Sequence, residues 1–229
     1  MTPRTPTDSL ADAARALLGE HDVTDLLARL TRDAVLFAGA DAAGLLVRAD
    51  GRLETLTTTS HAAEHLEAFQ SQRAEGPCVD VVETGQAVEA VGRQEIVDRW
   101  PTVGPAIVAA GFRVVHAVPL AWQGGVVGGL NVFGREPLTD EQRRSVRACA
   151  DMLTLVVGQP YRLSTLDFGR SIARALRDRV VVEQAKGALA HLLDVDVSAA
   201  YDELVARSER DGVSLTAVAH DVLLEAQAG

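Results

Sequence analysis

Apolar residues in the first part of the chain recur with the spacing of amphipathic helices. From Asp22 onward they lie at i, i+3, i+4 and i+7, which is the pattern of one helix face. These positions are Val23, Leu26, Leu27, Leu30 and Phe37. Gly19 separates this helix from an earlier helical stretch, Leu10–Leu18. The chain is therefore predicted to begin with two helices.

The pattern then changes to short segments typical of strands. Residues 44–49 and 53–59 flank Asp50-Gly51, a dipeptide that favours a two-residue hairpin turn. Arg113–Trp122 and Val126–Phe133 form a second predicted hairpin, because their β-branched residues favour strand over helix. The segments expected between the hairpins are a helix at His61–Gln70, a glycine/proline loop at Ala74–Cys78, a strand at Val88–Val91 and a helix at Val103–Ala110.

A capping box opens the helix that closes this region. Thr139 and Gln142 have the spacing at which the threonine caps backbone donors and the glutamine reaches back. The apolar residues behind them form one helix face: Val146, Cys149, Ala150, Leu153, Val156 and Val157. Residues 20–158 are therefore predicted to be an α+β domain, an antiparallel sheet flanked by helices.

Beyond Gly158 every periodic segment is helical. A long helix is predicted at Leu166–Leu193. Its apolar stripe consists of Val181, Ala185, Ala188, Leu189 and Leu192. The boundaries of two further helices are predicted at the caps Ser198 and Ser214 and at the terminator Gly212. Residues 163–229 are therefore predicted to be a second, all-α domain of three helices, joined to the first through Gly158–Leu163.

Composition is that of an ordinary soluble globular protein. Hydrophobic residues make up 47% and charged residues 24% of the 229 residues. No apolar run reaches the roughly 18 residues of a membrane-spanning helix, and residues 1–20 lack an apolar signal-peptide centre. Two cysteines do not make a disulfide framework. We expect a cytoplasmic protein with no membrane contact.

The charge of the chain is polarised. A net charge of −10 argues against a protein that coats nucleic acid through bulk charge. Residues 162–187, however, hold six basic and three acidic side chains, whereas residues 188–229 hold two basic and eight acidic ones. Lys186 is the only lysine, and its surroundings match neither a P-loop nor a lysine-dependent active site, so both are excluded. One predicted helix of an acidic protein is therefore locally positive.

The C-terminal region resembles an ANTAR domain. The most specific segment of the likeness is Glu183-Gln-Ala-Lys-Gly187, within Ala175–Leu189, and Val197–Leu204 and Leu215–Ala219 extend it. The resemblance implies an RNA-binding transcription antiterminator. Its target would be a pair of small hairpin loops that hold a transcript in its antiterminated form.

Residue spacing separately supports RNA contacts from the long helix. Arg179, Glu183 and Lys186 share one helix face, and an arginine stripe lies beside them. Sequence-specific RNA binders pair such cations with phosphates, although a stripe of this kind can also be a solvated face. Gly187 costs roughly 1 kcal/mol inside a helix, which a close approach of RNA or another helix would justify. The residues predicted to bind RNA are Arg170, Arg174, Arg177, Arg179, Gln184, Lys186 and Gly187.

The upstream region resembles a GAF domain, which implies a sensor. The markers of this likeness are Glu75–Cys78, Val118–Leu120 and Gly124–Asn131. The residues we expect to contact a ligand of the sensor are Cys78, Val114 and His116. The resemblance leads one to expect an apolar residue at 116 and a small polar one at 114, and this chain has neither. Packing roles in the core are the alternative for Cys78 and His116.

Two segments could instead carry enzyme chemistry. His61-Ala-Ala-Glu-His65 matches the H-x-x-E-H pattern of inverted zinc peptidases, with Glu64 as base. No third ligand follows it, so we expect a solvated helix face. Cys78 could be a redox nucleophile, as in GAF-fold thiol enzymes, but free cysteines are mostly buried packing residues. A thiol or metal enzyme is therefore one alternative, and a dimerisation scaffold that binds no RNA is another.

We expect a signal-responsive, RNA-binding regulator of transcription antitermination that is not an enzyme and has no catalytic residue, metal or cofactor. Its expected partners are hairpin loops of a leader transcript and an unknown small-molecule or protein signal at the GAF-like domain. A homodimer would supply two loop-binding surfaces. The apolar faces of the helices at residues 22–37 and 139–157 are wide enough to build its interface.

Overall fold

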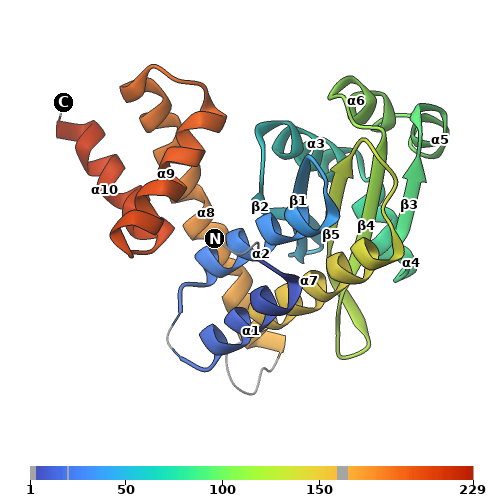
Figure 1. The fold of residues 1–229 in the computed structure, drawn as a ribbon, viewed down its shortest axis with the longest axis horizontal. Helices are drawn as coiled ribbons and strands as arrows, with labels where there is room; N and C mark the ends of the chain where they lie inside the picture. The colour runs from blue at the N-terminus through green and yellow to red at the C-terminus, as the bar shows by residue number, and fades with distance from the viewer. Residues whose placement is uncertain (1–3, 20, 159–164, 229) are drawn as a thin grey trace.

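A five-stranded antiparallel sheet forms the centre of the N-terminal region in the computed structural model, which describes residues 4–19, 21–158 and 165–228 (Figure 1). The strands lie in the order β2-β1-β5-β4-β3. Their bounds are β1 (Ala42–Ala49), β2 (Arg52–Thr58), β3 (Val88–Val91), β4 (Val114–Trp122) and β5 (Gly125–Gly134). The two hairpins meet where β1 pairs with β5 in the middle of the sheet.

Both predicted hairpins are confirmed, and their turns have the expected chemistry. Asp50 and Gly51 have φ angles of 49° and 78°, and Gln123 and Gly124 have 48° and 84°. Positive φ at both central residues defines the turn whose twist matches the flanking strands. The second turn is one residue shorter than the predicted Gln-Gly-Gly connection, because Gly125 already belongs to β5.

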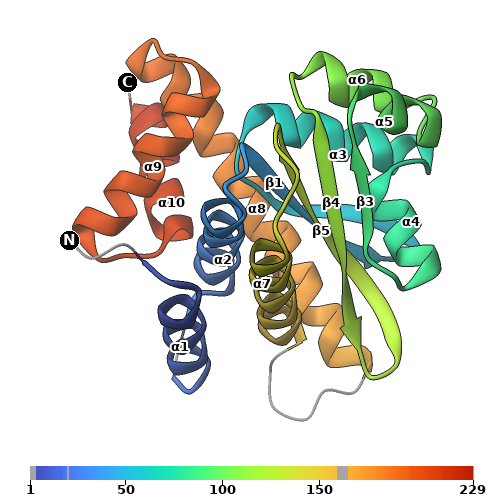
Figure 2. The ribbon, with the colours of Figure 1, turned by 45° about the vertical axis from the view of Figure 1, so that its right-hand side comes forward.

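Helices cover both faces of the sheet (Figure 2). One face packs against α2 (Val23–Ala38) and α7 (Asp140–Gly158), with α1 (Pro6–Leu17) beside them. The opposite face packs against α3 (His61–Arg73), α4 (Pro77–Thr84), α5 (Arg93–Arg99) and α6 (Gly104–Ala109). Alternating strand side chains serve the two cores: Val114 and Val118 face the first, and Val115 and Ala117 face the second.

Two short helices, α4 and α5, do not follow from the sequence pattern. Cys78 was expected in a loop, and this expectation is wrong, because Pro77 occupies the start of α4 and Cys78 lies in its first turn. The helix ends at Gly85, which has a φ of 69°. α4 and α5 have 8 and 7 residues, and the glycines that precede them, Gly76 and Gly92, indicate loops in the sequence.

The apolar faces of α2 and α7 are buried within the chain. Leu27 and Leu30 of α2 share one buried cluster with Leu153 and Val156 of α7 and with the strand residues between them. The expectation that these faces build a dimer interface is therefore wrong, because the sheet and the two helices cover one another. Dimerisation itself stays a prediction.

Three helices follow residue 164: α8 (Thr165–Leu193), α9 (Val197–Asp211) and α10 (Leu215–Ala228). From Val182 onward they enclose a core of their own, to which Ala28 of α2 also contributes, whereas Ile172 and Ala175 of α8 are buried in the core of α2, α7 and the sheet. The predicted stripe is wrong at Leu192, which is 47% exposed, since the last turn of α8 extends past the helices that cover it. Asp196, not Ser198, caps α9 by accepting a hydrogen bond from the Ala199 amide at 2.8 Å. Gly212 and Ser214 act as predicted.

The helical unit lies beside the β2 edge of the sheet, whereas α5 and α6 lie at the β3 edge (Figure 1). α8 contacts β2, β1 and α7, and α10 contacts α2. Apart from Gly158, which ends α7, the predicted connection through Leu163 lies outside the described residues. Among the helices that the structure describes, none is long and apolar enough to cross a membrane.

Candidate nucleic-acid interface

The residues predicted to bind RNA all lie on α8, and most of them are exposed. The exposed members are Arg170, Arg174, Arg177, Gln184 and Gly187. Their spacing places them along one side of the helix. A Cβ atom at Gly187 would meet no heavy atom within 4 Å, so packing against another helix does not explain this glycine. The exposed side of α8 thus combines arginine side chains with room for a close approach.

Arg179 and Lys186 lie elsewhere, against α3 of the N-terminal domain. Lys186 Nζ lies 3.0 Å from Glu64 Oε2 and 2.5 Å from Glu183 Oε2, and its side chain is only 9% exposed. Arg179 Nη2 lies 3.3 Å from Glu64 Oε1. We call these four residues the Glu64 latch. The sequence correctly predicts that Arg179, Glu183 and Lys186 share a face, but that face is turned towards the other domain.

The latch is a charged cluster held together by opposite charges. Burial alone would raise the pKa of Glu64, but hydrogen bonding and charge from Lys186, with the charge of Arg179, lower it below the usual value. Burial lowers the pKa of Lys186, and the two carboxylates outweigh it and raise that pKa. Burial raises the pKa of Glu183, and Glu64 adds to this effect. Glu64 is therefore ionised opposite a protonated lysine at neutral pH.

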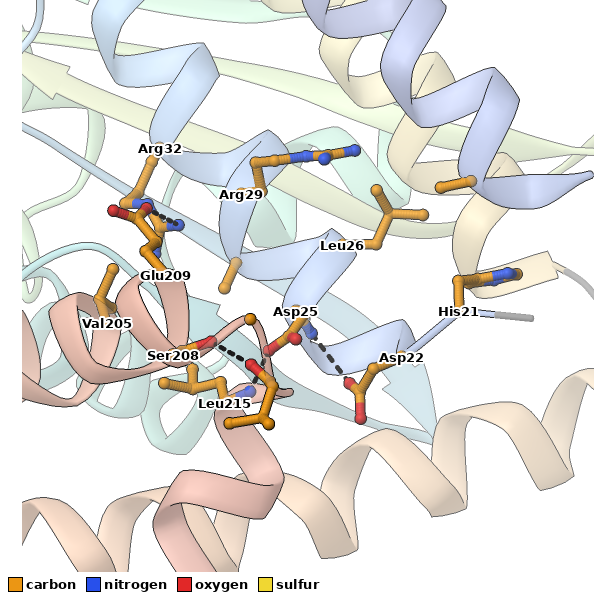
Figure 3. Close-up of a pocket in the computed structure, with 14 residues that line it drawn as sticks. His21, Asp22, Asp25, Leu26, Arg29, Arg32, Val205, Ser208, Glu209 and Leu215 are labelled. Carbon is orange, nitrogen blue, oxygen red and sulfur yellow. Dashed lines mark hydrogen bonds and ion pairs between the residues drawn. The ribbon is translucent and has the colours of Figure 1, made fainter. Parts of the chain in front are cut away.

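A second contact between the domains borders a cavity of about 350 Å³ between α2 and the α9–α10 connection (Figure 3). Asp25 Oδ1 accepts a hydrogen bond from the Leu215 amide at 2.6 Å, and Arg32 lies 3.8 Å from Glu209. Burial raises the pKa of Asp25 to about 6. Nε and Nη2 of Arg29, which also lines the cavity, have no hydrogen-bond partner among the described residues. Polar contacts thus tie the start of α10 to α2.

The three predicted ligand residues of the N-terminal domain are not brought together. Cys78 is fully buried on the α3–α6 side of the sheet, where its Sγ would meet a Cβ atom at Gly129. Val114 and His116 lie on the opposite face, under α7. His116 Nδ1 lies 3.0 Å from Glu89 Oε2, and burial lowers the pKa of His116. Both Cys78 and His116 sit as core residues, and their ligand role stays a prediction.

A buried polar cluster fills the space between α3 and the sheet. Glu67 is fully buried, and Asn131 Nδ2 donates to both its carboxyl oxygens at 2.9 Å. Gln70 also donates to Glu67 and accepts from the Cys78 amide at 3.0 Å. Burial raises the pKa of Glu67 to about 8, so the carboxyl group is largely protonated at neutral pH. A Cβ atom at Gly44 would collide with Glu67, which explains the glycine.

The residues proposed for an alternative enzyme have the wrong surroundings for that role. Burial, with a further contribution from Glu67, raises the pKa of the Cys78 thiol well above its usual value, the reverse of an activated nucleophile. His61 and His65 are exposed on α3. Within the described residues, no group of three or more His, Cys, Asp or Glu side chains could hold a metal ion.

Sequence reasoning missed Glu64 as a partner of α8, Asp25 as a partner of α10, and the buried Glu67. Glu64 stands within the H-x-x-E-H motif, which drew attention to its histidines instead. Glu67 reads as one more polar residue of a solvated helix, and only the packing of α3 on the sheet reveals its burial.

Models of two protein families match the chain. The GAF domain model covers residues 20–157, and the ANTAR domain model covers residues 170–223. A comparison with curated protein sequences gave no match. The first match spans the sheet with α2–α7, and the second lies within α8–α10.

Solved structures resemble the N-terminal domain in fold. The GAF domain of a phosphoenolpyruvate-protein phosphotransferase from Acinetobacter has a TM-score of 0.50 and 13% identity, over 68% of this chain and 93% of that chain. The corresponding domain from Coxiella burnetii has a TM-score of 0.51 and 15% identity, over 66% of this chain and 92% of that chain. The phycocyanobilin-bound GAF domain of a cyanobacterial phytochrome has a TM-score of 0.51 and 12% identity, over 68% of this chain and 95% of that chain. The chain belongs to the GAF domain family and also carries an ANTAR domain, so it joins a signal-sensing domain to an RNA-binding antitermination domain.

Proposed function

We propose that this protein is a cytoplasmic, signal-responsive regulator of transcription antitermination that binds paired hairpin loops of a nascent transcript. The observation that carries the proposal is the exposed arginine side of α8 within the ANTAR match. Arg174 and Arg177 can reach phosphates, and Gly187 leaves room for the RNA backbone or a splayed base. The partners are therefore hairpin loops of a leader transcript.

The Glu64 latch supplies a way for the sensor to control this surface. Lys186 and Arg179 contact the GAF domain in the structure, so RNA phosphates and Glu64 compete for the same two cations. A small-molecule or protein signal that shifts α3 would weaken these contacts. The part of α8 that carries Arg179 and Lys186 would then separate from α3. The docked arrangement is accordingly the form with lower RNA affinity.

The test is binding of a labelled two-hairpin RNA, against a control with scrambled loops, over a salt series. Arg174→Ala/Arg177→Ala removes two exposed cations of α8. Arg52→Ala/Arg93→Ala removes two exposed arginines of the GAF domain and serves as the matched control. We expect loop-dependent binding that only the first pair loses, with a salt slope reduced by about one for each phosphate contact removed. Equal binding to both RNAs would contradict the proposal.

A homodimer completes the proposal, because two hairpin loops require two copies of α8. In a dimer each chain supplies one copy of α8, and each copy binds one loop. Light scattering at micromolar concentration, with and without RNA, measures this directly. A chain that stays monomeric in both conditions contradicts the paired-loop arrangement.

The proposal assigns the chain no catalytic activity. It is supported by the buried Cys78 thiol, whose raised pKa disfavours the reactive thiolate. A thiol enzyme predicts an activity that Cys78→Ser abolishes and Lys186→Ala leaves intact. The proposed regulator predicts that Lys186→Ala weakens RNA binding and that Cys78→Ser leaves it intact.

A further inference from the structure

The histidine pair on α3 has a geometry that the proposed RNA surface does not use. His61 and His65 lie one helical turn apart, and their Nε2 atoms are 2.8 Å from each other. The ring centroids are 4.3 Å apart with an interplanar angle of 80°. Both side chains are exposed, so an ion from solvent can reach the two nitrogens. In this hydrogen bond one Nε2–H donates to the other Nε2, and an ion that replaces the shared proton finds two nitrogens one helical turn apart.

We propose that His61 and His65 bind one transition-metal ion of the zinc, nickel or copper class, and that the bound ion opens the Glu64 latch. Two imidazole nitrogens that share an ion at about 2.1 Å lie about 3.0–3.4 Å apart, so the nitrogens need to separate by a few tenths of an ångström and the rings need to turn until both lone pairs point at the ion. Imidazole nitrogen favours these metals over magnesium and calcium. Water completes the coordination, and the site is regulatory, unlike the catalytic zinc site weighed from the sequence.

Glu64 is placed to orient one of the two ligands. Its Oε2 lies 3.4 Å from His61 Nδ1, on the far side of the ring from Nε2. A histidine that binds a metal through one nitrogen usually donates the other N–H to a carboxylate, which fixes the tautomer and makes the ligand more basic. The carboxylate that holds Lys186 is thus also the partner of His61.

Charge couples the ion to the latch. Glu64 already lies within 3.3 Å of both Lys186 and Arg179, so a bound divalent ion brings a third cation to a single carboxylate. His61, Glu183 and Lys186 line one cavity of about 20 Å³, the size of one water molecule, so the histidine and the lysine lie around the same small space. The ion therefore repels both cations of α8 and competes for Glu64.

The first experiment titrates Zn²⁺ or Ni²⁺ into the full chain by calorimetry. His65→Ala is the informative variant, because the replacement removes one ligand of the ion and because His65 has no contact with Glu64 among those described. His220→Ala, which removes an exposed histidine of α10, is the matched control. We expect one ion per chain in the wild type and in His220→Ala, and loss of this binding in His65→Ala. Retention of the binding in His65→Ala overturns the site.

The second experiment measures affinity for the two-hairpin RNA with and without the ion. We expect the ion to raise the affinity of the wild type about tenfold, an ordinary size for coupling between two sites. His65→Ala, in the same buffer, controls for effects of the metal on the RNA and shows no gain. Glu64→Gln also shows none, because its latch is already weakened. Metal binding without a gain in wild-type RNA affinity means a surface chelate only and overturns the coupling.

The coupling to RNA rests on the proposed function, and the opening of the latch can be measured without RNA. Small-angle scattering is expected to show a larger radius of gyration of the wild type when the ion is added, and no change for His65→Ala. If Glu64→Gln binds no RNA under any condition, the proposed function fails, while calorimetry and scattering still decide the metal site and the latch. An unchanged radius with the ion bound overturns the opening.

Discussion

Replacing Glu64 with glutamine removes the charge that holds two cations of α8 on the GAF domain while leaving the shape of the side chain. The carboxylate is 20% exposed, and its partners Lys186 and Arg179 are 9% and 28% exposed. Hydrogen bonds to charged groups contribute about 1.5–3 kcal/mol each. Lys186 keeps Glu183, and the amide oxygen of glutamine still accepts, so we expect a loss of about 2 kcal/mol of docking free energy.

A loss of this size changes the ratio of docked to undocked protein about 30-fold. If RNA binds the undocked form, the apparent dissociation constant is the intrinsic one divided by the undocked fraction. Glu64→Gln is therefore expected to bind the two-hairpin RNA up to about 30-fold more tightly than the wild type. Fluorescence anisotropy with labelled RNA at fixed salt measures the difference.

Glu54→Gln is the matched control for this experiment. Glu54 is exposed on β2 and its side chain makes no hydrogen bond or ion pair within the described residues, and its replacement changes the net charge by the same amount. Repeating both measurements over a salt series separates release of the latch from the general gain in RNA affinity that a less acidic protein shows. If Glu64→Gln and Glu54→Gln gain affinity equally, or if Glu64→Gln gains none, the latch does not restrain RNA binding and the reasoning is refuted.

Three further predictions concern stability. Glu67 has a folded-state pKa of about 8 against an ordinary value of 4.5. Between these two pH values the folded protein holds a proton that the unfolded chain releases. The free energy of unfolding therefore falls as pH rises, by at most about 1.4 kcal/mol per pH unit. Urea denaturation from pH 5 to 8 is expected to show a steeper loss of stability in the wild type than in Glu67→Gln, in which Asp25 still contributes with this sign; equal slopes contradict the buried carboxylic acid. Gly187→Ala is expected to stabilise the chain by up to about 1 kcal/mol, because alanine favours helix and meets no neighbour, yet to weaken RNA binding; unchanged RNA affinity would remove Gly187 from the interface. Leu153→Ala, at a fully buried position of α7, is expected to cost about 3–4 kcal/mol in the free energy of unfolding, and a cost below about 1 kcal/mol would mean that α7 is not part of the core.

Local signals in the sequence account for most of the helices and strands. Asp50-Gly51 predicts the first hairpin because both residues tolerate the positive φ angles of the turn, and the β-branched residues on either side of Gln123-Gly124-Gly125 predict the second. Thr139 and Gln142 predict the start of α7 because their hydrogen bonds span only three residues. The failures are local as well: α4 and α5 follow glycines that indicate loops, and Asp196 competes with Ser198 as the cap of α9.

The candidate interface divides in the same way. Charge polarity and helical spacing predict a basic face on α8, and the exposed Arg174 and Arg177 agree with it. The partners of Lys186 and Arg179 could not be predicted, because Glu64 stands 122 and 115 residues away in the chain. No periodic pattern encodes which surface of one domain meets another.

The sequence alone determined the order of the strands and of every helix except α4 and α5, the two-domain organisation and the likeness to GAF and ANTAR families, because these depend on periodicity, turn chemistry and motifs of neighbouring residues. Only the tertiary structure decided that α2 and α7 bury each other's apolar faces, that Glu67 is held as a buried acid, and that Glu64 contacts Lys186. Each of these depends on side chains from distant segments that meet only when the sheet and helices pack. In an acidic chain with one lysine, that packing determines whether the lysine faces RNA or a carboxylate of its own protein.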